Sequence, residues 1–386
     1  MEDIELQNRL LEIFHYLHEH PETSWNEYNT TAYIRQFLEE EGIPYKVFDD
    51  CPGIVAEMGN GKPVVAVRAD MDALWQEVDG EFKANHSCGH DAHMTIVMGL
   101  ILKLKTCHWK KGTVRFIFQP AEEKGNGAIT MVEKGVVDDA DYLFGVHLRP
   151  IEELRLKQAA PSIRHGAAEF LVANIYGSDF HGARPHQGVN VIDVISLINF
   201  QLKNICFSPQ QSYSIKMTKC QAGGENFNII PGSGQFALDV RAESNQLLQK
   251  IKEKVENVIK SAKSMGVEIS YKWIDFTPAA EVSAEAENLL RKGIIETFGE
   301  SGCVSSLVTS GSDDFHFYTI KRPHLKAAML GLGANLKPGL HHPHMTFDHS
   351  CLIDGVQILK TAVMEALKND RFSNGHCLSL FELLKR

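Results

Sequence analysis

The stretch Pro63-Val-Val-Ala-Val-Arg-Ala-Asp-Met-Asp-Ala-Leu74 begins as an apolar run and continues into a loop that carries two aspartates. Short and almost wholly apolar runs recur at Val114–Phe118 and Tyr142–Val146, and a helical apolar pattern covers Ala92–Leu104. Strands of this kind are typical of a sheet that is covered by helices on both faces. This part of the chain therefore predicts an α/β fold with a mixed sheet between helices.

The pattern changes between residues 169 and 280. Strands here alternate polar and apolar residues, as in Ser212–Lys219, where Tyr213, Ile215 and Met217 mark one face. The order strand, helix, strand, strand, helix, strand fits a β-α-β-β-α-β, ferredoxin-like module with one wet face. Apolar strands resume after residue 281, so we predict a discontinuous domain of residues 1–168 and 281–386 and an inserted α+β domain of residues 169–280.

Length and composition exclude several classes of protein. The 386 residues exceed the ~250 to 300 at which single cores stop growing, which also favours two domains. With 39 basic and 49 acidic residues the net charge is −10, which argues against a nucleic-acid partner. The longest uncharged apolar run, Thr95–Leu102, is far shorter than the ~18 residues of a membrane span. Eight cysteines without regular spacing indicate buried thiols, and we predict a soluble cytoplasmic protein.

Side chains of the types that bind metal ions gather in loops, several of which follow the predicted strands. In open α/β sheets, ligands bind at the carboxyl edge where such loops meet. The loops are Arg68–Leu74 with Asp70 and Asp72, Cys88-Gly-His-Asp-Ala-His93, Gln119-Pro-Ala-Glu-Glu-Lys-Gly125, Gly145-Val-His147 and Leu340-His-His-Pro-His344. Together they supply enough thiol, imidazole and carboxylate groups for two ions.

The loop of residues 88–93 has two interpretations. Gly89 lets the backbone turn so that Cys88 and His90 face one point, which suits a metal site. The same residues also suit a plain helix start, with Asp91 as the N-cap and Cys88 as a small buried side chain. Four potential ligands within six residues favour the metal site.

The loop after Val114–Phe118 carries the adjacent pair Glu122 and Glu123. Neighbouring side chains point in different directions, so one glutamate can bind metal while the other acts as a general base. A lone D-x-D pair more often marks a turn, and a lone strand-end histidine such as His147 is more often structural. These weaker signals become more informative because several such loops are expected to meet at the same edge of the sheet.

Eight motifs resemble those of the M20 metallopeptidase family in order and spacing, most closely its aminoacylase-like branch. The motifs are RADMDAL, CGHDAH, QPAEE, GVH, HGARPH, NFNIIPG, GSDDF and LHHP. That branch includes N-acyl amino acid amidohydrolases, hippurate hydrolases and auxin-conjugate hydrolases. The likeness covers the chain from about residue 10 to residue 368.

The resemblance implies a role for each matching residue in the larger, catalytic domain. It makes Glu122 the catalytic base, Asp72 an orienting carboxylate, and the metal ligands Cys88, His90, Glu123, His147 and His341. Cys88 stands where other members of the family carry a bridging aspartate. A thiolate suits zinc or a similar metal such as manganese, cobalt or nickel, so two such divalent ions are expected in each subunit.

The inserted domain corresponds to the lid and dimerisation domain of the family, which implies a homodimer. His181 matches a lid histidine that donates to the developing oxyanion, in its own or in a partner's active site. Asn228 resembles a polar contact to substrate, and Gly311 belongs to a motif that lines the substrate pocket. Arg241 projects from the wet sheet face and suits a substrate carboxylate, although a plain surface arginine fits the pattern equally.

The implied activity is hydrolysis of the amide bond of N-acyl amino acids or small amide conjugates, by a metal-bound water with Glu122 as general base. A dipeptidase or carboxypeptidase of the same family stays open, because its substrates share the amide and the terminal carboxylate. A non-catalytic protein that binds acylated amino acids is the alternative of another class, but it would not need Glu122. Phe180 and Trp75 depart from the branch, which usually has a small residue and Pro there, so the acyl pocket is expected to differ.

Overall fold

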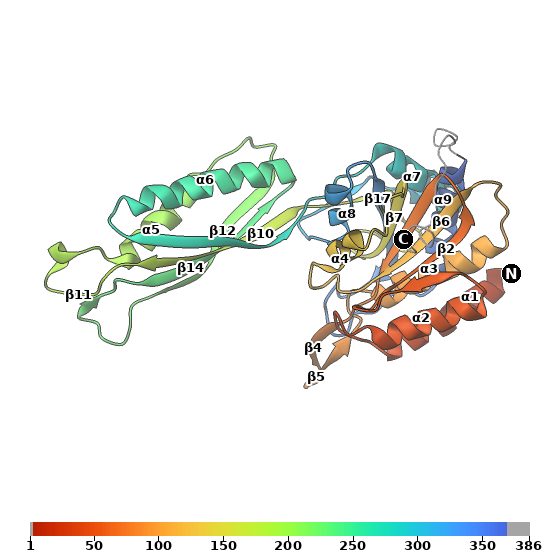
Figure 1. Ribbon diagram of the computed structural model, residues 1–386, viewed down its shortest axis with the longest axis horizontal. Helices are drawn as coiled ribbons and strands as arrows, with labels where there is room; N and C mark the ends of the chain where they lie inside the picture. The colour runs from red at the N-terminus through yellow and green to blue at the C-terminus, as the bar shows by residue number, and fades with distance from the viewer. Residues whose placement is uncertain (1–2, 369–386) are drawn as a thin grey trace. The chain divides into compact units, whose positions relative to one another are not determined.

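The computed structural model describes residues 3–368 (Figure 1). These residues form two compact units, one of residues 3–164, 281–307 and 314–368 and the other of residues 165–280 and 308–313. Residues 369–386 of the predicted larger domain lie outside the described part of the chain, and the domain boundaries predicted from the sequence stay a prediction.

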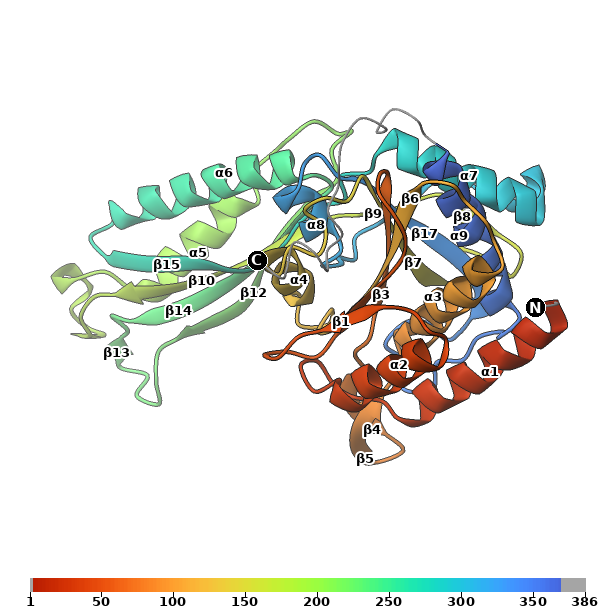
Figure 2. The ribbon, with the colours of Figure 1, turned by 45° about the vertical axis from the view of Figure 1, so that its right-hand side comes forward.

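The larger unit is built on a seven-stranded sheet with the strand order β1-β2-β6-β3-β7-β17-β8 (Figure 2). The strands, in that order, are Tyr45–Val47, Ile54–Asn60, Gly112–Gln119, Val64–Asp70, Tyr142–Pro150, Lys326–Leu336 and Ala159–Ala160. Strands β6, β3, β7 and β17 run parallel, whereas β1, β2 and β8 pair antiparallel with their neighbours. The predicted mixed α/β sheet is confirmed.

Helices cover this sheet on both faces. On one face lie α1 (Asp3–Glu19), α2 (Tyr28–Glu40), α3 (His90–Lys105), α7 (Ala284–Phe298) and α9 (Cys351–Leu367), and on the other lie α4 (Gly127–Glu133) and α8 (His316–Lys321). In β3, Val65 and Val67 pack into the first of these layers, while Val64 and Ala66 pack into the second. Burial on both faces explains why these strands are apolar throughout.

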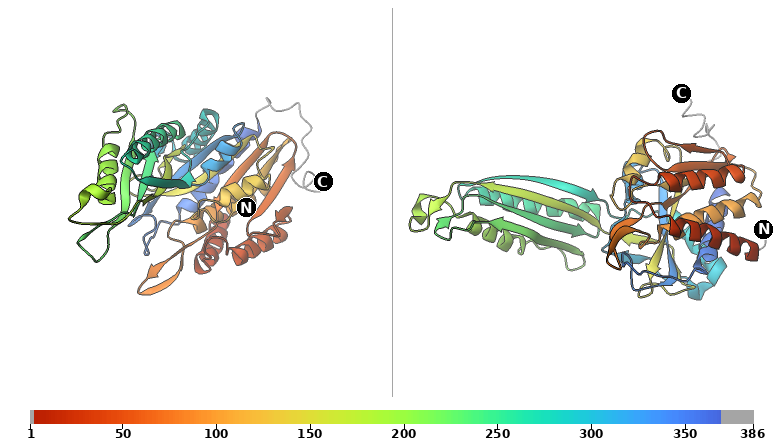
Figure 3. Two further views of the ribbon diagram at one scale, coloured as in Figure 1. Left: turned by 60° about the vertical axis from the view of Figure 1, so that its left-hand side comes forward. Right: turned by 90° about the horizontal axis from the view of Figure 1, so that it is seen from below.

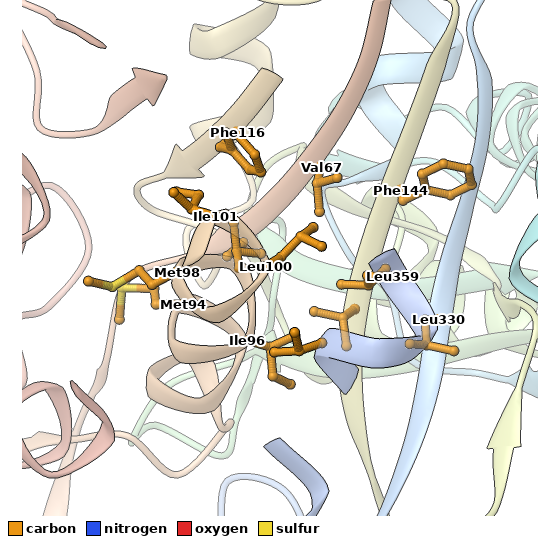
Figure 4. Packing of buried hydrophobic residues seen from close by; sticks show 14 of the residues in the cluster. Val67, Met94, Ile96, Met98, Leu100, Ile101, Phe116, Phe144, Leu330 and Leu359 are labelled. Carbon is orange, nitrogen blue, oxygen red and sulfur yellow. The ribbon is translucent and has the colours of Figure 1, made fainter. Parts of the chain in front are cut away.

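Helix α3 is buried along almost its whole length. Figure 4 shows Ile96, Leu100 and Ile101 of α3 in the same cluster as Val67 of β3 and Leu359 of α9. Such close packing leaves the helix little freedom to shift, because each displaced apolar side chain would lose contacts. The N-terminus of α3, which begins at His90, is therefore held firmly against the carboxyl end of the sheet.

The smaller unit is a four-stranded antiparallel sheet with the order β12-β14-β10-β15 (Figure 3). Its strands are Tyr213–Ala222, Gly234–Ala242, Ala167–Tyr176 and Glu268–Thr277 in that order, and its helices are α5 (Val191–Leu202) and α6 (Asn245–Lys263). Both helices lie on one face of this sheet (Figure 1). Their apolar residues, such as Ile198 and Ile251, pack against Leu171 and Phe236 of the strands. This is the predicted β-α-β-β-α-β module.

Short elements complete the two units. They are β4 (Leu74–Val78), β5 (Glu81–Asn85), β9 (Ile163–His165), β11 (Phe180–His181), η1 (Pro185–Gln187), β13 (Ile229–Ile230), η2 (Glu300–Gly302) and β16 (Leu307–Thr309). Among residues 3–368, none of the helices combines the length and the apolar character that crossing a bilayer requires.

Candidate metal centre

The parallel strands of the larger unit bring three of the predicted loops to one edge of the sheet. In the register of β3 with its neighbours, Asp70 pairs with Gln119 of β6 and Arg68 pairs with Gly145 of β7. His147 lies two residues beyond Gly145, which is the level of Asp70. Asp72 and the pair Glu122 and Glu123 therefore follow adjacent strands at their carboxyl ends, and His147 lies within the last part of β7 at the same edge.

The turn before α3 adds two more side chains at this edge. Gly89 is the N-cap residue and has a φ of 86°, a left-handed conformation that glycine adopts at little cost. This turn separates Cys88 from His90, and both side chains are buried. The Sγ atom of Cys88 lies 3.7 Å from Nε2 of His147. Asp91 is not the N-cap residue, although its carboxylate does accept a hydrogen bond from the Ala92 N–H.

Two groups of potential ligands overlap at Cys88. The ligand atoms of Cys88, His90 and His147 all lie within 4.8 Å of one another, and so do those of Cys88, Glu123 and His341. His341 comes from far along the chain, and its backbone N–H donates to the Ser87 carbonyl over 2.7 Å. Thiolate sulfur can bind two ions at once, so this arrangement suits a pair of ions that share Cys88.

Two buried atoms at this point have no hydrogen-bond partner among the described residues. They are Nε2 of His90 and Oε1 of Glu123, which lie 4.0 Å apart. The Nδ1 atom of His90 is 2.8 Å from the Asp72 carbonyl oxygen, which assigns its proton to Nδ1 and leaves a lone pair on Nε2. Burying such polar atoms without partners is costly. A divalent cation between them would remove that cost, so these residues fit a metal site.

Imidazole orientation is fixed at His147 in the same way. Its Nδ1 atom lies 2.7 Å from the Leu148 carbonyl oxygen, so Nδ1 carries the proton and the lone pair of Nε2 lies on the Cys88 side. A hydrogen bond from the second ring nitrogen to a carbonyl group is the usual support of a metal-binding histidine.

His93 differs, although it lies within 4.8 Å of potential ligand atoms of Asp70 and His90. Its Nδ1 atom is 2.7 Å from the Asp70 carboxylate, and its Nε2 atom accepts the Leu148 N–H over 3.0 Å. Both ring nitrogens are therefore in use within the fold, which removes His93 from the candidate ligands. Burial opposes ionisation of Asp70, yet the neighbouring His90 and Arg68 hold its pKa well below the usual range.

Asp72 links the loops of the candidate centre. Its carboxylate accepts the backbone N–H groups of Glu122 over 3.1 Å and of Glu123 over 3.0 Å, and the Ser24 hydroxyl over 2.6 Å. Burial opposes ionisation, but hydrogen bonds from His90 and Ser24 hold the pKa of Asp72 below its usual range. The result is a charged carboxylate that orients both glutamates and His90.

The two glutamates face the same space. An Oε2 atom of Glu122 lies 3.9 Å from Nε2 of His90, and Oε1 of Glu122 accepts the Asp314 N–H over 3.5 Å. Nε2 of His341 lies 3.4 Å from Oε1 of Glu123, and this carboxylate raises the pKa of His341. Burial and then Glu123 raise the pKa of the Cys88 thiol well above its usual range. A bound divalent cation would reverse that effect, because thiols that coordinate a metal are deprotonated.

The smaller unit brings two other predicted residues together. His181 and Asn228 line one cavity of about 510 Å³, together with Asp179, Phe180, Asn226 and Ile229. The Ala183 N–H donates to Nδ1 of His181 over 3.1 Å, so the neutral ring carries its proton on Nε2 and can donate from that atom. The Phe180 ring occupies the space beside Gly188, where an added Cβ would lie 1.7 Å from it.

Arg241 and Gly311 also belong to the smaller unit. The guanidinium of Arg241 contacts the Asp239 carboxylate over 3.1 to 3.3 Å and the Ser310 carbonyl oxygen over 3.2 Å. A substrate carboxylate would have to compete with Asp239 for it. The Gly311 N–H donates to the Thr309 hydroxyl over 3.2 Å. Trp75 lies on β4 in the larger unit, and 64% of its surface is exposed.

Some residues that support the centre carried no assigned role in the sequence. Ser24 donates to Asp72 from 48 residues away, and Glu27 accepts the Ala121 N–H over 2.8 Å. Both residues lie in a polar stretch without periodicity, so the sequence does not predict that their side chains are buried. Asp70 was noted in the D-x-D pair but given no role; it is the last residue of β3, and its carboxylate contacts Arg68 and His93.

Known proteins are similar to this chain in sequence and fold. A profile described as Peptidase family M20/M25/M40 matches residues 66–365. N-acetylcysteine deacetylase of Bacillus subtilis is 30% identical over 95% of this chain and 100% of its own length. IAA-amino acid hydrolase ILR1-like 6 of Arabidopsis thaliana is 31% identical over 92% of this chain and 80% of its own. A crystal structure from Bacillus subtilis, described as a dinuclear metal-binding peptidase from the M20 family, has a TM-score of 0.81 at 27% identity and covers 95% of this chain and 99% of that one.

Proposed function

This chain belongs to peptidase family M20/M25/M40, and on that premise we propose that it hydrolyses the amide bond of N-acyl amino acids with Glu122 as general base. Membership makes it a metal-dependent hydrolase of amide bonds. The observation that carries the finer proposal is the pair of overlapping ligand groups that share Cys88, with the Glu122 carboxylate beside them.

Divalent metal is the expected cofactor, and we propose two ions per subunit, with zinc, manganese, cobalt and nickel as candidates. The ions would supply Lewis acidity that activates water and polarises the substrate carbonyl. Cys88, His90, Glu123, His147 and His341 are the proposed ligands. Their support is geometric, since the buried atoms Nε2 of His90 and Oε1 of Glu123 lie 4.0 Å apart, and Oε1 of Glu123 lies 3.4 Å from Nε2 of His341.

Glu122 is the proposed acid and base. Its backbone N–H donates to Asp72, which holds the backbone of Glu122 in place. Its carboxylate lies 3.9 Å from Nε2 of His90. In the proposed reaction an Oε atom of Glu122 takes a proton from water and later donates it to the leaving amine. A positioned group in this role typically contributes about 10² to 10⁴ in rate.

His181 is the proposed donor to the oxyanion that forms on the former carbonyl oxygen. Its proton on Nε2 supports this role, because only a protonated nitrogen can donate. Asn228, Gly311 and Arg241 are the proposed substrate contacts, with Arg241 exchanging Asp239 for the substrate carboxylate. The proposal covers two cases, in which His181 acts in the active site of its own subunit or in that of a partner subunit.

Assembly and location complete the proposal. A homodimer through the smaller unit is supported by the edge strands β12 and β15 of its sheet, since unpaired edges favour association. A cytoplasmic location is supported by the cysteines, which are all free thiols within residues 3–368.

The test is release of free amino acid from N-acetyl amino acids, N-benzoyl amino acids and dipeptides, with metal-free protein that is reloaded with each candidate ion. We expect turnover of the N-acyl substrates, and turnover lower by about 10² to 10⁴ in the Glu122→Gln variant under the same conditions. Preference for dipeptides would replace the proposal with a peptidase. Absence of turnover on every substrate, with binding retained, would favour a protein that only binds acylated amino acids.

A further inference from the structure

Three consecutive backbone N–H groups at the candidate centre donate to two buried carboxyl groups. Ala121 donates to Oε1 of Glu27 over 2.8 Å, while Glu122 and Glu123 donate to Asp72 over 3.1 and 3.0 Å. The mechanism proposed above uses Asp72 but gives Glu27 no role. Glu27 precedes helix α2 and reaches this segment from 94 residues away in the sequence.

The segment that receives these bonds has an unusual backbone. Ala121 has a φ of 55°, in the left-handed region that residues with a Cβ seldom adopt. Such a conformation persists only where its surroundings enforce it. Ala121 is fully buried, and its carbonyl oxygen accepts the Gly127 N–H over 3.2 Å. The hydrogen bond from Ala121 to Glu27 therefore holds the residue from which the chain turns into Glu122.

Glu27 is itself an expensive residue at this place. Its side chain is fully buried, and Oε2 has no hydrogen-bond partner within residues 3–368. Burial, and then the negative charge of Asp72, raise the pKa of Glu27 to about 8. An apolar residue would avoid these costs. A role for the Oε1 atom of Glu27 would explain why a carboxyl group is present at this position.

We propose that Glu27 is a positioning residue that acts through the Ala121 N–H to fix the backbone carrying the base Glu122 and the metal ligand Glu123. It acts on the centre through this backbone and not through the metal or the substrate. Supports of this outer kind typically change metal affinity or activity by about 10- to 100-fold when they are lost. The assignment rests on the proposed roles of the two glutamates, but one of its measurements is independent of catalysis.

The experiment compares Glu27→Gln, which keeps an acceptor in the same place, with Glu27→Leu, which removes it at similar size. For each we would measure kcat, KM, the affinity for the added metal ion by competition with a chelator, and Tm. Leucine should lower kcat and metal affinity by about 10-fold or more with little change in KM, while glutamine stays within a few-fold of the wild type. If leucine keeps both kcat and metal affinity, the proposal is wrong.

Glu22 offers a matched control from the same loop. Its carboxylate accepts the N–H groups of Asn29 and Thr30 at the start of α2 and not those of residues 121–123. Glu22→Ala should lower Tm and leave kcat and metal affinity unchanged. If this variant and Glu27→Leu lower all three quantities alike, Glu27 serves only the stability of the fold.

Replacing Ala121 keeps the test decisive where Glu27→Leu folds poorly. Glycine adopts positive φ readily, so Ala121→Gly reduces the need for an enforcing contact. The double variant Glu27→Leu/Ala121→Gly should therefore recover part of the lost metal affinity. No recovery in the double variant would contradict a role through the Ala121 backbone. Metal affinity distinguishes this outcome from failure of the proposed reaction, because it is measured without substrate.

Discussion

Asp72 and Glu123 are joined by a hydrogen bond of 3.0 Å, in which the Glu123 backbone N–H donates to the Asp72 carboxylate. The same carboxylate accepts the Glu122 N–H, and its Oδ1 atom lies 3.3 Å from Nδ1 of His90. One side chain after β3 therefore sets the positions of residues after β6 and at the start of α3. Through these contacts Asp72 joins three segments of the candidate centre.

Asp72→Asn should weaken the centre although it preserves the shape of the side chain. An amide nitrogen in place of one oxygen cannot accept a backbone N–H, so either Glu122 or Glu123 loses its partner. We expect metal affinity and kcat to fall by about 10- to 100-fold. Titration with metal ion and steady-state kinetics would measure both. Asp50→Asn, at an exposed ion pair with Lys134, should change neither quantity.

The adjacent glutamates should separate in their effects. Glu122→Gln removes the proposed base and should lower kcat by about 10² to 10⁴ while the bound metal stays at the wild-type level. Glu123→Gln removes a proposed ligand and should lower metal content first. Elemental analysis beside the amino-acid release assay would distinguish the two. Substantial activity in Glu122→Gln would mean that the base is misassigned.

Metal stoichiometry tests the sharing of Cys88. Cys88 belongs to both ligand groups, whereas His147 and His341 belong to one each. Cys88→Ala should therefore reduce binding at both positions, and His147→Ala or His341→Ala should each leave one ion bound. Measurement of metal per subunit after dialysis against a weak chelator would show the difference. Two retained ions in Cys88→Ala would exclude a bridging thiolate.

Apolar runs and the alternation of polar and apolar residues in the sequence were enough to predict the fold class. The helical pattern of Ala92–Leu104 lies within α3, and the apolar runs mark β3, β6 and β7. The hairpin of β4 and β5 was not predicted, because each strand has only 5 residues and few of them are buried. Helix α2 was missed because polar residues cover most of its surface.

The candidate site could be predicted only in part. The sequence indicates which loops carry ligand-type side chains, because residue types are visible without a structure. It does not indicate hydrogen bonds between distant residues, such as that from Ser24 to Asp72, or the tautomers they fix. His93 illustrates the limit, because its two ring nitrogens are occupied by Asp70 and the Leu148 N–H, and neither contact follows from a local pattern.

His181→Ala should lower kcat by about 10² to 10³ and leave metal content unchanged, because loss of one oxyanion donor typically has that effect. The Ala183 N–H fixes the proton on Nε2, so His181→Gln, which also presents an N–H donor, should recover part of the loss. His186→Ala, at an exposed position in the same segment, is the control. Equal loss of activity and metal would make His181 structural.

Glu27 should make the metal-free protein less stable as pH rises. Its pKa is raised from 4.5 to about 8 by burial and by Asp72, so between these values the folded state holds a proton that the unfolded state has released. Since the folded state then binds more protons, the free energy of unfolding must fall with rising pH, by at most about 1.4 kcal/mol per pH unit for one group.

Glu27→Gln removes this titration and should flatten the dependence between pH 5 and pH 8. Urea unfolding of both proteins in the presence of a chelator gives the difference in stability at each pH, which cancels the contribution of all other groups. The free energy of unfolding of the Glu27→Gln variant, relative to that of the wild type, should increase as pH rises through the window. Below pH 4.5 this difference should be constant. A difference that stays constant across the window would mean that Glu27 is already ionised in the fold, beside the charge of Asp72.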